Sequence, residues 1–151
     1  MSRAAMEAAF LATTYRVETP ERSFDLRIGV ASAGFDEFLC RQAVSLGKPA
    51  AAGPAGAAIG WGIVTAYNPG ERLSEHQNEI RQRRLRERIA ASAGACFAAS
   101  NLPDADAHWP VEPSYLVLPV DEQRLAALGR EFCQLAVVYG ETGLAPRLLW
   151  L

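Results

Sequence analysis

The stretch Thr65-Ala66-Tyr67-Asn68-Pro69-Gly70 joins two elements of the predicted fold. The run from Trp61 to Asn68 combines glycine, aliphatic and aromatic residues with β-branched side chains, which predicts a buried strand. Pro69 fixes φ at the first central position of a turn, and Gly70 accepts the positive φ that the second position of a type II turn requires. The chain should therefore turn sharply just after Asn68.

A long helix is predicted beyond this turn. Ser74 and Gln77 have the spacing of a capping box, and the Glu, Gln and Arg residues that follow favour helix. We expect the helix to run from Ser74 to about Ala93 and to end at Gly94. A strand end, a tight turn and a helix start therefore follow one another closely, which makes this region a candidate site.

One stripe of the predicted helix combines polar and apolar residues. Its members, at helical spacing, are Asn78, Arg81, Leu85, Ile89 and Ser92. Leu85 and Ile89 indicate that this face packs on the sheet, so Asn78 and Arg81 stand where apolar residues are expected. Buried polar groups need partners. These two side chains either bond backbone carbonyls or a carboxylate such as Glu112, or they bind an anion near the helix N-terminus.

Further motifs extend this pattern along the chain. They are Leu26-Arg27-Ile28-Gly29, Thr65-Ala66-Tyr67-Asn68-Pro69, Leu73-Ser74, Asn78, Arg81, Trp109-Pro110-Val111-Glu112-Pro113-Ser114 and Phe132-Cys133-Gln134-Leu135-Ala136. With these motifs the sequence resembles the bacterial domain-of-unknown-function family 3293 over most of its length. It departs from the family pattern at Cys133 and Leu135, where the family usually has Gly and Asn. The resemblance implies no particular reaction or cofactor.

Five polar side chains from these motifs are the candidate ligand-binding residues: Asn68, Asn78, Arg81, Glu112 and Gln134. They supply amide donors and acceptors, a guanidinium that fits phosphate or carboxylate, and one carboxylate that suits a general base. We expect either a pocket for a small anionic or nucleotide-like ligand or a non-catalytic protein-interaction domain in which these residues are structural. Convergence on one concave spot favours the first hypothesis, and separate pairing with the backbone favours the second.

Glu112 has a specific expected position. Pro110 and Pro113 stiffen the backbone on either side of it, and Ser114 begins an apolar strand. We therefore expect Glu112 at the entrance of a strand, facing the helix that carries Arg81. Its carboxylate would stabilise the guanidinium there.

Other chemistries have weaker signals. The glycine-rich run from Gly53 to Gly60 lacks GK[ST] and leads into a strand, so it is a poor phosphate loop. Asp104, Asp106 and His108, with Glu112 nearby, offer oxygen and nitrogen ligands for a divalent metal, but acidic residues in a polar loop are usually solvated and we assign no metal. No GxSxG elbow accompanies the two histidines.

A basic run lies on the long helix at Arg83, Arg84, Arg86 and Arg88. Acidic residues are interleaved with it, and Glu79 stands four residues before Arg83. This mixture is typical of a salt-bridged solvent face, so nucleic acid is not the expected partner; a protein partner or a homodimer is the alternative to a small ligand.

Length and composition are those of one soluble globular domain covering 1–151. Half of the 151 residues are hydrophobic and the formal net charge is −2. Cys40, Cys96 and Cys133 are odd in number and widely spaced, which favours buried thiols in a reducing cytoplasm. Glu7 interrupts the apolar N-terminal run, which makes a signal peptide a poor interpretation, and no run is long enough for a membrane span.

The remaining elements complete the predicted fold. We expect helices at 3–13 and 35–44, strands at 15–18, 23–30, 96–100 and 114–118, a connector at 47–56, and a loop at 101–113. Asp121 should cap a helix carrying Leu125, Leu128 and Phe132. The runs 135–139 and 144–150, joined by Gly-Glu-Thr-Gly, predict a C-terminal β-hairpin. The fold class is α+β, with a mixed, mostly antiparallel sheet packed by helices.

Overall fold

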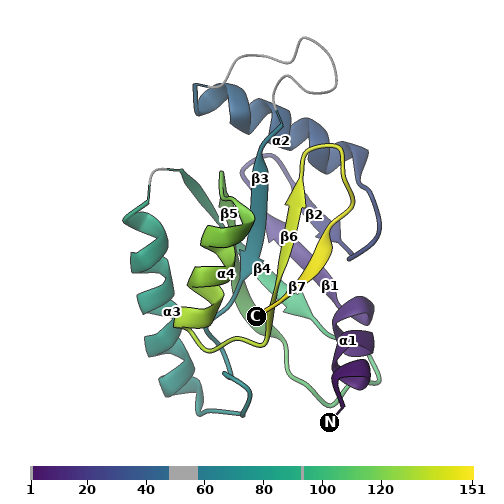
Figure 1. Ribbon diagram of the computed structural model, residues 1–151, viewed down its shortest axis with the longest axis vertical. Coiled ribbons are helices and arrows are strands. Elements are labelled where there is room, and N and C mark those ends of the chain that lie inside the picture. Colours follow the sequence, from purple (N-terminus) through teal and green to yellow (C-terminus); the bar gives the residue numbers. More distant parts are fainter. Residues whose placement is uncertain (1, 48–57, 93) are drawn as a thin grey trace.

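The computed structural model describes residues 2–47, 58–92 and 94–151, which form four helices and one seven-stranded sheet (Figure 1). The helices are α1 (Arg3–Ala12), α2 (Ala33–Ser45), α3 (Glu75–Ala90) and α4 (Glu122–Glu131). The strands are β1 (Thr14–Glu18), β2 (Ser23–Leu26), β3 (Gly60–Val64), β4 (Ala95–Leu102), β5 (Glu112–Leu118), β6 (Ala136–Glu141) and β7 (Arg147–Trp150). The α+β class is confirmed.

The sheet has the strand order β2-β1-β4-β5-β3-β6-β7, and each of its pairs is antiparallel. The sequence predicted some parallel pairing. β5 and β6, which α4 connects, do run in the same direction, but β3 lies between them and pairs with both. The predicted C-terminal hairpin is confirmed, since β6 pairs with β7 at the edge of the sheet.

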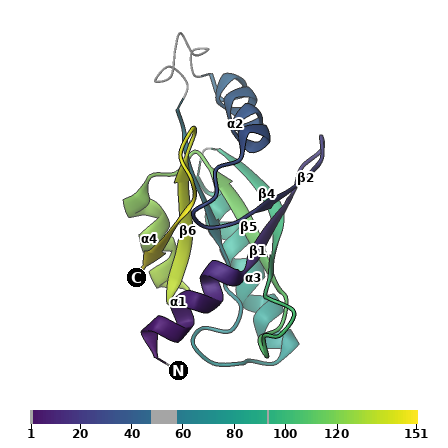
Figure 2. The same cartoon turned by 90° about the vertical axis from the view of Figure 1, so that its right-hand side faces the viewer.

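Each face of the sheet has its own hydrophobic core. On one face, α2 inserts Phe35, Phe38 and Leu39 against Trp61 and other strand residues. On the opposite face, α3 and α4 pack together on the sheet through Leu85, Ile89 and Leu125. Figure 2 shows α2 and α4 on opposite sides of the strands. The strands between the two cores are therefore covered on both faces.

The helix starts follow the predicted capping signals. Ser74 and Gln77 form the expected capping box at the start of α3. The Asp121 side chain accepts a hydrogen bond from the Arg124 N–H, as expected for the cap of α4. Helix α3 ends at Ala90, a little earlier than the predicted end at Ala93.

Three sequence expectations need correction or limitation. The strand predicted at 23–30 ends at Leu26, because the chain turns through Gly29, which has φ of +83° and donates its N–H to the Pro146 carbonyl. The cysteines are not all buried: Cys96 and Cys133 are exposed and Cys40 is intermediate. The predicted connector at 47–56 lies almost wholly outside the described residues.

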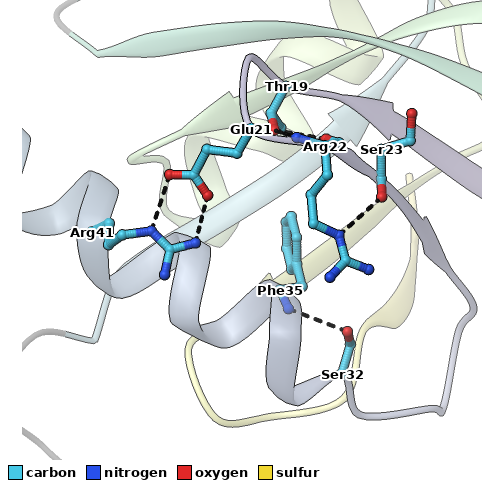
Figure 3. Close-up of polar contacts among 7 residues, drawn as sticks. All are labelled: Thr19, Glu21, Arg22, Ser23, Ser32, Phe35 and Arg41. Carbon is cyan, nitrogen blue, oxygen red and sulfur yellow. Dashed lines mark hydrogen bonds and ion pairs between the residues drawn. The ribbon is translucent and has the colours of Figure 1, made fainter.

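The β1–β2 hairpin is fastened to α2 at its turn (Figure 3). Glu21 accepts two hydrogen bonds from the Arg41 guanidinium of α2, at 2.5 and 3.0 Å. Ser32 caps the start of α2 by accepting from the N–H of Phe35, whose ring packs edge-on against Phe24 of β2. The Glu21–Arg41 pair and the Phe24–Phe35 contact hold the hairpin beside α2.

Candidate functional site

The chain leaves the sheet after Val64 but stays buried through the 65–68 segment, which consists of Thr65, Ala66, Tyr67 and Asn68. The predicted strand at 61–68 therefore ends early. The backbone groups of this buried segment have no strand neighbour, and buried N–H and C=O groups require partners. Side chains supply them.

Helix α3 provides three of these side chains. Gln82 accepts a hydrogen bond from the Ala66 N–H at 2.9 Å, and the Nε of Arg81 donates to the Ala66 carbonyl at 2.8 Å. One turn earlier, Asn78 accepts from the Asn68 N–H at 2.9 Å. These three side chains of α3 thus complete the hydrogen bonds that a neighbouring strand would otherwise make.

Asn68 is the centre of the turn. Its φ of +44° lies in the left-handed region, which Asn tolerates better than most residues. Its side-chain oxygen accepts from the N–H of Leu73 and from the amide of Asn78, both at 2.9 Å. Its side-chain nitrogen donates to Glu112 at 2.7 Å. Asn68 therefore links the turn to both α3 and β5.

Glu112 stands at the start of β5 as the sequence predicted, but among the described residues it forms no ion pair with Arg81. Side chains alternate along β5, so Glu112 shares the face of Leu116 and Leu118, which pack in the α2 core. Arg81 belongs to α3, which packs on the opposite face. The guanidinium bonds carbonyl oxygens instead, and the Glu112 carboxylate accepts from Asn68.

The Glu112 carboxyl is almost completely buried, with 8% exposure. Burial raises its pKa above the ordinary value of 4.5, and the hydrogen bond from Asn68 and the nearby Trp109 indole offset part of that rise. Trp109, in the loop that precedes β5, therefore lies near this buried carboxyl.

The C-terminal end of α4 is tied to the same segment. Gln134 donates to the Tyr67 carbonyl at 3.1 Å and to the Phe132 carbonyl at 3.3 Å. Arg81 also donates to the Phe132 carbonyl. The 65–68 segment is therefore held by α3, by β5 and by the residues that follow α4.

The five predicted residues do come together, and sequence reasoning missed a sixth. We call the following side chains the polar network: Asn68, Asn78, Arg81, Gln82, Glu112 and Gln134. Gln82 lies four residues after Asn78 and three before Leu85, so the helical period placed it on the same buried face. Within the described part of the chain, every buried side-chain nitrogen or oxygen atom has a hydrogen-bond partner.

An exposed surface adjoins the network. Trp109 is 42% exposed and Val111 is 57% exposed. The Arg72 guanidinium lies over the Trp109 ring, with 6.0 Å between its central carbon and the ring centroid. We call Arg72, Trp109 and Val111 the Trp109 surface. It is formed by the two loops that flank the network, before α3 and before β5.

The described residues contain no candidate metal site. No group of three or more His, Cys, Asp or Glu side chains gathers among them in a way that suits a metal ion. Asp104, one of the candidate ligands in the polar loop, accepts a hydrogen bond from the Ala105 N–H. No helix in the described ranges is long and apolar enough to cross a membrane.

The fold and site define an α+β domain whose central strand continues into a buried turn held by polar side chains. Residues 64–137 match the model of the family described as "Protein of unknown function (DUF3293)". The family assignment made from the sequence motifs is thereby confirmed, and the matched range contains the whole polar network. No curated protein and no solved structure matches the chain.

Proposed function

We propose that the protein is a non-catalytic protein-interaction domain whose contact region is the Trp109 surface. The observation that carries this proposal is the position of Trp109. Its side chain is substantially exposed, yet the indole lies close enough to the buried Glu112 carboxyl to lower the pKa of that group. A large aromatic side chain at the surface thus has two polar neighbours, Arg72 and Glu112.

An aromatic side chain suits binding because it has few rotatable bonds, so little side-chain freedom is lost when a partner covers it. Trp and Arg are also enriched among the residues that contribute most to protein interfaces. Arg72 stacks on Trp109, and Val111 adds an exposed apolar side chain two residues further on. The polar network adjoins this surface, because Asn68 donates a hydrogen bond to the Glu112 carboxylate, which lies near Trp109.

A small anionic ligand at Asn68, Asn78, Arg81, Glu112 and Gln134 is the second candidate. These residues converge on one segment, as that hypothesis requires. Their hydrogen bonds, however, go to one another and to backbone groups of residues 66–68, 73 and 132, which supports the structural role more strongly. A cytoplasmic location is a further proposal, supported by three cysteines that form no disulfide among themselves.

The interaction proposal is tested with Trp109→Ser, using Leu144→Ser as the matched control. Leu144 is also exposed, at 60%, but it lies in the β6–β7 turn. Immobilised parent and variants are compared for proteins retained from a lysate of the source cells, and each retained protein is then purified and titrated by calorimetry. Sedimentation equilibrium of the parent tests binding to a second copy.

We expect a defined partner that binds the parent and the Leu144→Ser variant equally. Trp109→Ser should weaken that binding by at least about 2 kcal/mol, the loss that marks a dominant interface residue. A partner that binds Trp109→Ser as tightly as the parent would place the interaction elsewhere on the molecule and defeat the proposal.

A further inference from the structure

A groove lies between α3 and α4, away from the polar network. Its volume is about 550 Å³, within the range of about 300 to 1,000 Å³ that small-molecule sites occupy. The C-terminal end of α3 and one side of α4 form its walls, and β4 and β5 contribute to its lining. Figure 1 shows these two helices side by side.

The lining of the groove is more apolar than polar. Ile89, Val117 and Leu128 supply aliphatic side chains, and Ala127 on α4 is exposed along the wall. Cys96 also lines the groove and is exposed. An aliphatic or aromatic group placed here would be removed from water, which is favourable in proportion to its apolar area.

The charges at the rim are unequal. Arg88 and Glu131 form an ion pair at 2.9 Å, so they largely neutralise each other. Arg124 donates to the Ser92 hydroxyl, but among the described residues it joins no ion pair. A guanidinium carries five N–H donors, and one such contact leaves most of them available. The rim therefore has an excess positive charge at Arg124.

We propose that this groove binds a small amphiphilic carboxylate, with its apolar chain against Ile89, Val117 and Leu128 and its carboxylate on Arg124. The planar guanidinium matches a carboxylate with two parallel hydrogen bonds. The positive charge of Arg124 favours an anionic group, and the apolar lining favours an aliphatic chain attached to that group.

This site is independent of the proposed interaction function. The groove adjoins the C-terminal end of α3, whereas Arg72 of the Trp109 surface precedes its first residue. The 16 residues of α3 separate the two by about 24 Å. Failure of one proposal therefore leaves the other standing.

The first experiment uses the two exposed cysteines of the full chain as reporters. Sodium octanoate should slow alkylation of Cys96 by iodoacetamide, followed by mass spectrometry, because the ligand would cover this thiol. Cys133 is exposed but does not line the groove, so its alkylation should not change. Equal alkylation of Cys96 with and without saturating octanoate would overturn the proposal.

The second experiment measures affinity by calorimetry with octanoate, octan-1-ol and octylamine. Octanoate should bind best. Arg124→Gln should weaken its binding by about tenfold or more, as expected for loss of a charged hydrogen-bonding partner. Arg130→Gln, on the same helix but outside the groove, should bind like the parent.

A third variant tests the apolar part of the groove. Ala127→Trp places a large ring along the exposed wall and should abolish octanoate binding while the protein stays folded. Equal affinity for octan-1-ol and octanoate, tighter binding of octylamine, or unchanged octanoate binding by both Arg124→Gln and Ala127→Trp would each contradict the proposal.

Discussion

Ala66 has both of its backbone polar groups bonded to side chains of one helix, the N–H to Gln82 and the carbonyl to Arg81. A buried polar group that loses its partner costs about 1–3 kcal/mol. The polar residues on the buried face of α3 are therefore explained by the backbone that they satisfy. Their residue types follow from the groups to be paired: an amide oxygen for an N–H, and a guanidinium for two carbonyls.

Arg81→Met tests this role directly. Methionine keeps much of the apolar stem but removes the donors to the carbonyls of Ala66 and Phe132. We expect the free energy of unfolding to fall by about 1–3 kcal/mol. Chemical unfolding measures it, with Arg83→Met as a control, since Arg83 is exposed on the same helix.

The same pair of proteins tests the small-ligand hypothesis. A guanidinium kept ready for an anion would be costly in the unliganded protein, so its removal would leave stability unchanged or raise it. That result, together with a parent whose melting temperature rises with phosphate-rich ligands, would contradict the structural role and favour a binding site.

Cys133 is a second residue whose substitution should reveal local strain. It has φ of +56° directly after the C-cap of α4. The N–H groups of Cys133 and Gln134 donate to the carbonyls of Arg130 and Gly129, which is the Schellman pattern that usually has glycine at this position. Cys133→Gly should raise the free energy of unfolding by about 1 kcal/mol, because the left-handed conformation costs an L-residue about that much. Equal or lower stability in urea unfolding would show that the side chain contributes more than the strain costs.

At the level of elements, β5 explains why Glu112 and Arg81 do not pair. The two-residue period of the strand assigns Glu112 to the α2 face, and that assignment required knowledge of which face each helix covers. The sequence identified the start of the strand and the stiffening prolines but contained no signal for the order of the strands.

The buried carboxyl of Glu112 should make stability depend on pH. Its pKa is raised by burial, so the folded protein retains the proton at pH values where the unfolded chain, with a pKa near 4.5, has released it. The resulting stability is fully present below pH 4.5 and is lost as pH rises through the folded-state pKa. Urea unfolding of the parent and Glu112→Gln across this range should show a parent advantage that declines with rising pH. An advantage that grows with rising pH would mean that Glu112 is stabilised as a carboxylate.

The elements that sequence patterns predicted best are those with local signals. The capping residues Ser74 and Asp121 marked two helix starts, and the hairpin turn between β6 and β7 was evident from its glycines. The end of β3 was misjudged because β-branched Thr65 and aromatic Tyr67 continue the strand-favouring composition of Ile63 and Val64. Whether such a run pairs with a strand or with side chains depends on its neighbours in space.

At the scale of the whole molecule, the net charge of −2 and the acidic residues among the arginines of α3 lead us to expect no nucleic-acid partner. In the basic run of α3, Arg88 pairs with Glu131 of α4, and Arg86 lies over the Tyr115 ring at 5.9 Å. We expect no tight binding of RNA or DNA at physiological salt. A filter-binding titration checks this, with Arg83, Arg84, Arg86 and Arg88 changed to Gln as the comparison. Retention that falls steeply with salt and disappears in that variant would contradict the expectation.

The sequence indicated that Asn68, Asn78 and Arg81 lie close together, because they stand on either side of one turn, whereas Glu112 and Gln134 were included through the motifs of the family resemblance. Their partners were not accessible. From the sequence, the acceptor for Arg81 could be a ligand or a backbone carbonyl, since both present oxygen atoms that accept hydrogen bonds. Only the packing of α3 and α4 against the 65–68 segment determines that choice.

Amide hydrogen exchange by NMR tests the central claim most directly, namely that side chains of α3 hold the backbone of the 65–68 segment. In the parent, the N–H groups of Ala66 and Asn68 should be protected by Gln82 and Asn78. In Gln82→Met, protection of Ala66 should fall sharply while that of Asn68 persists. Exchange of both amides in the parent as fast as that of an exposed loop residue such as Glu71 would contradict the claim.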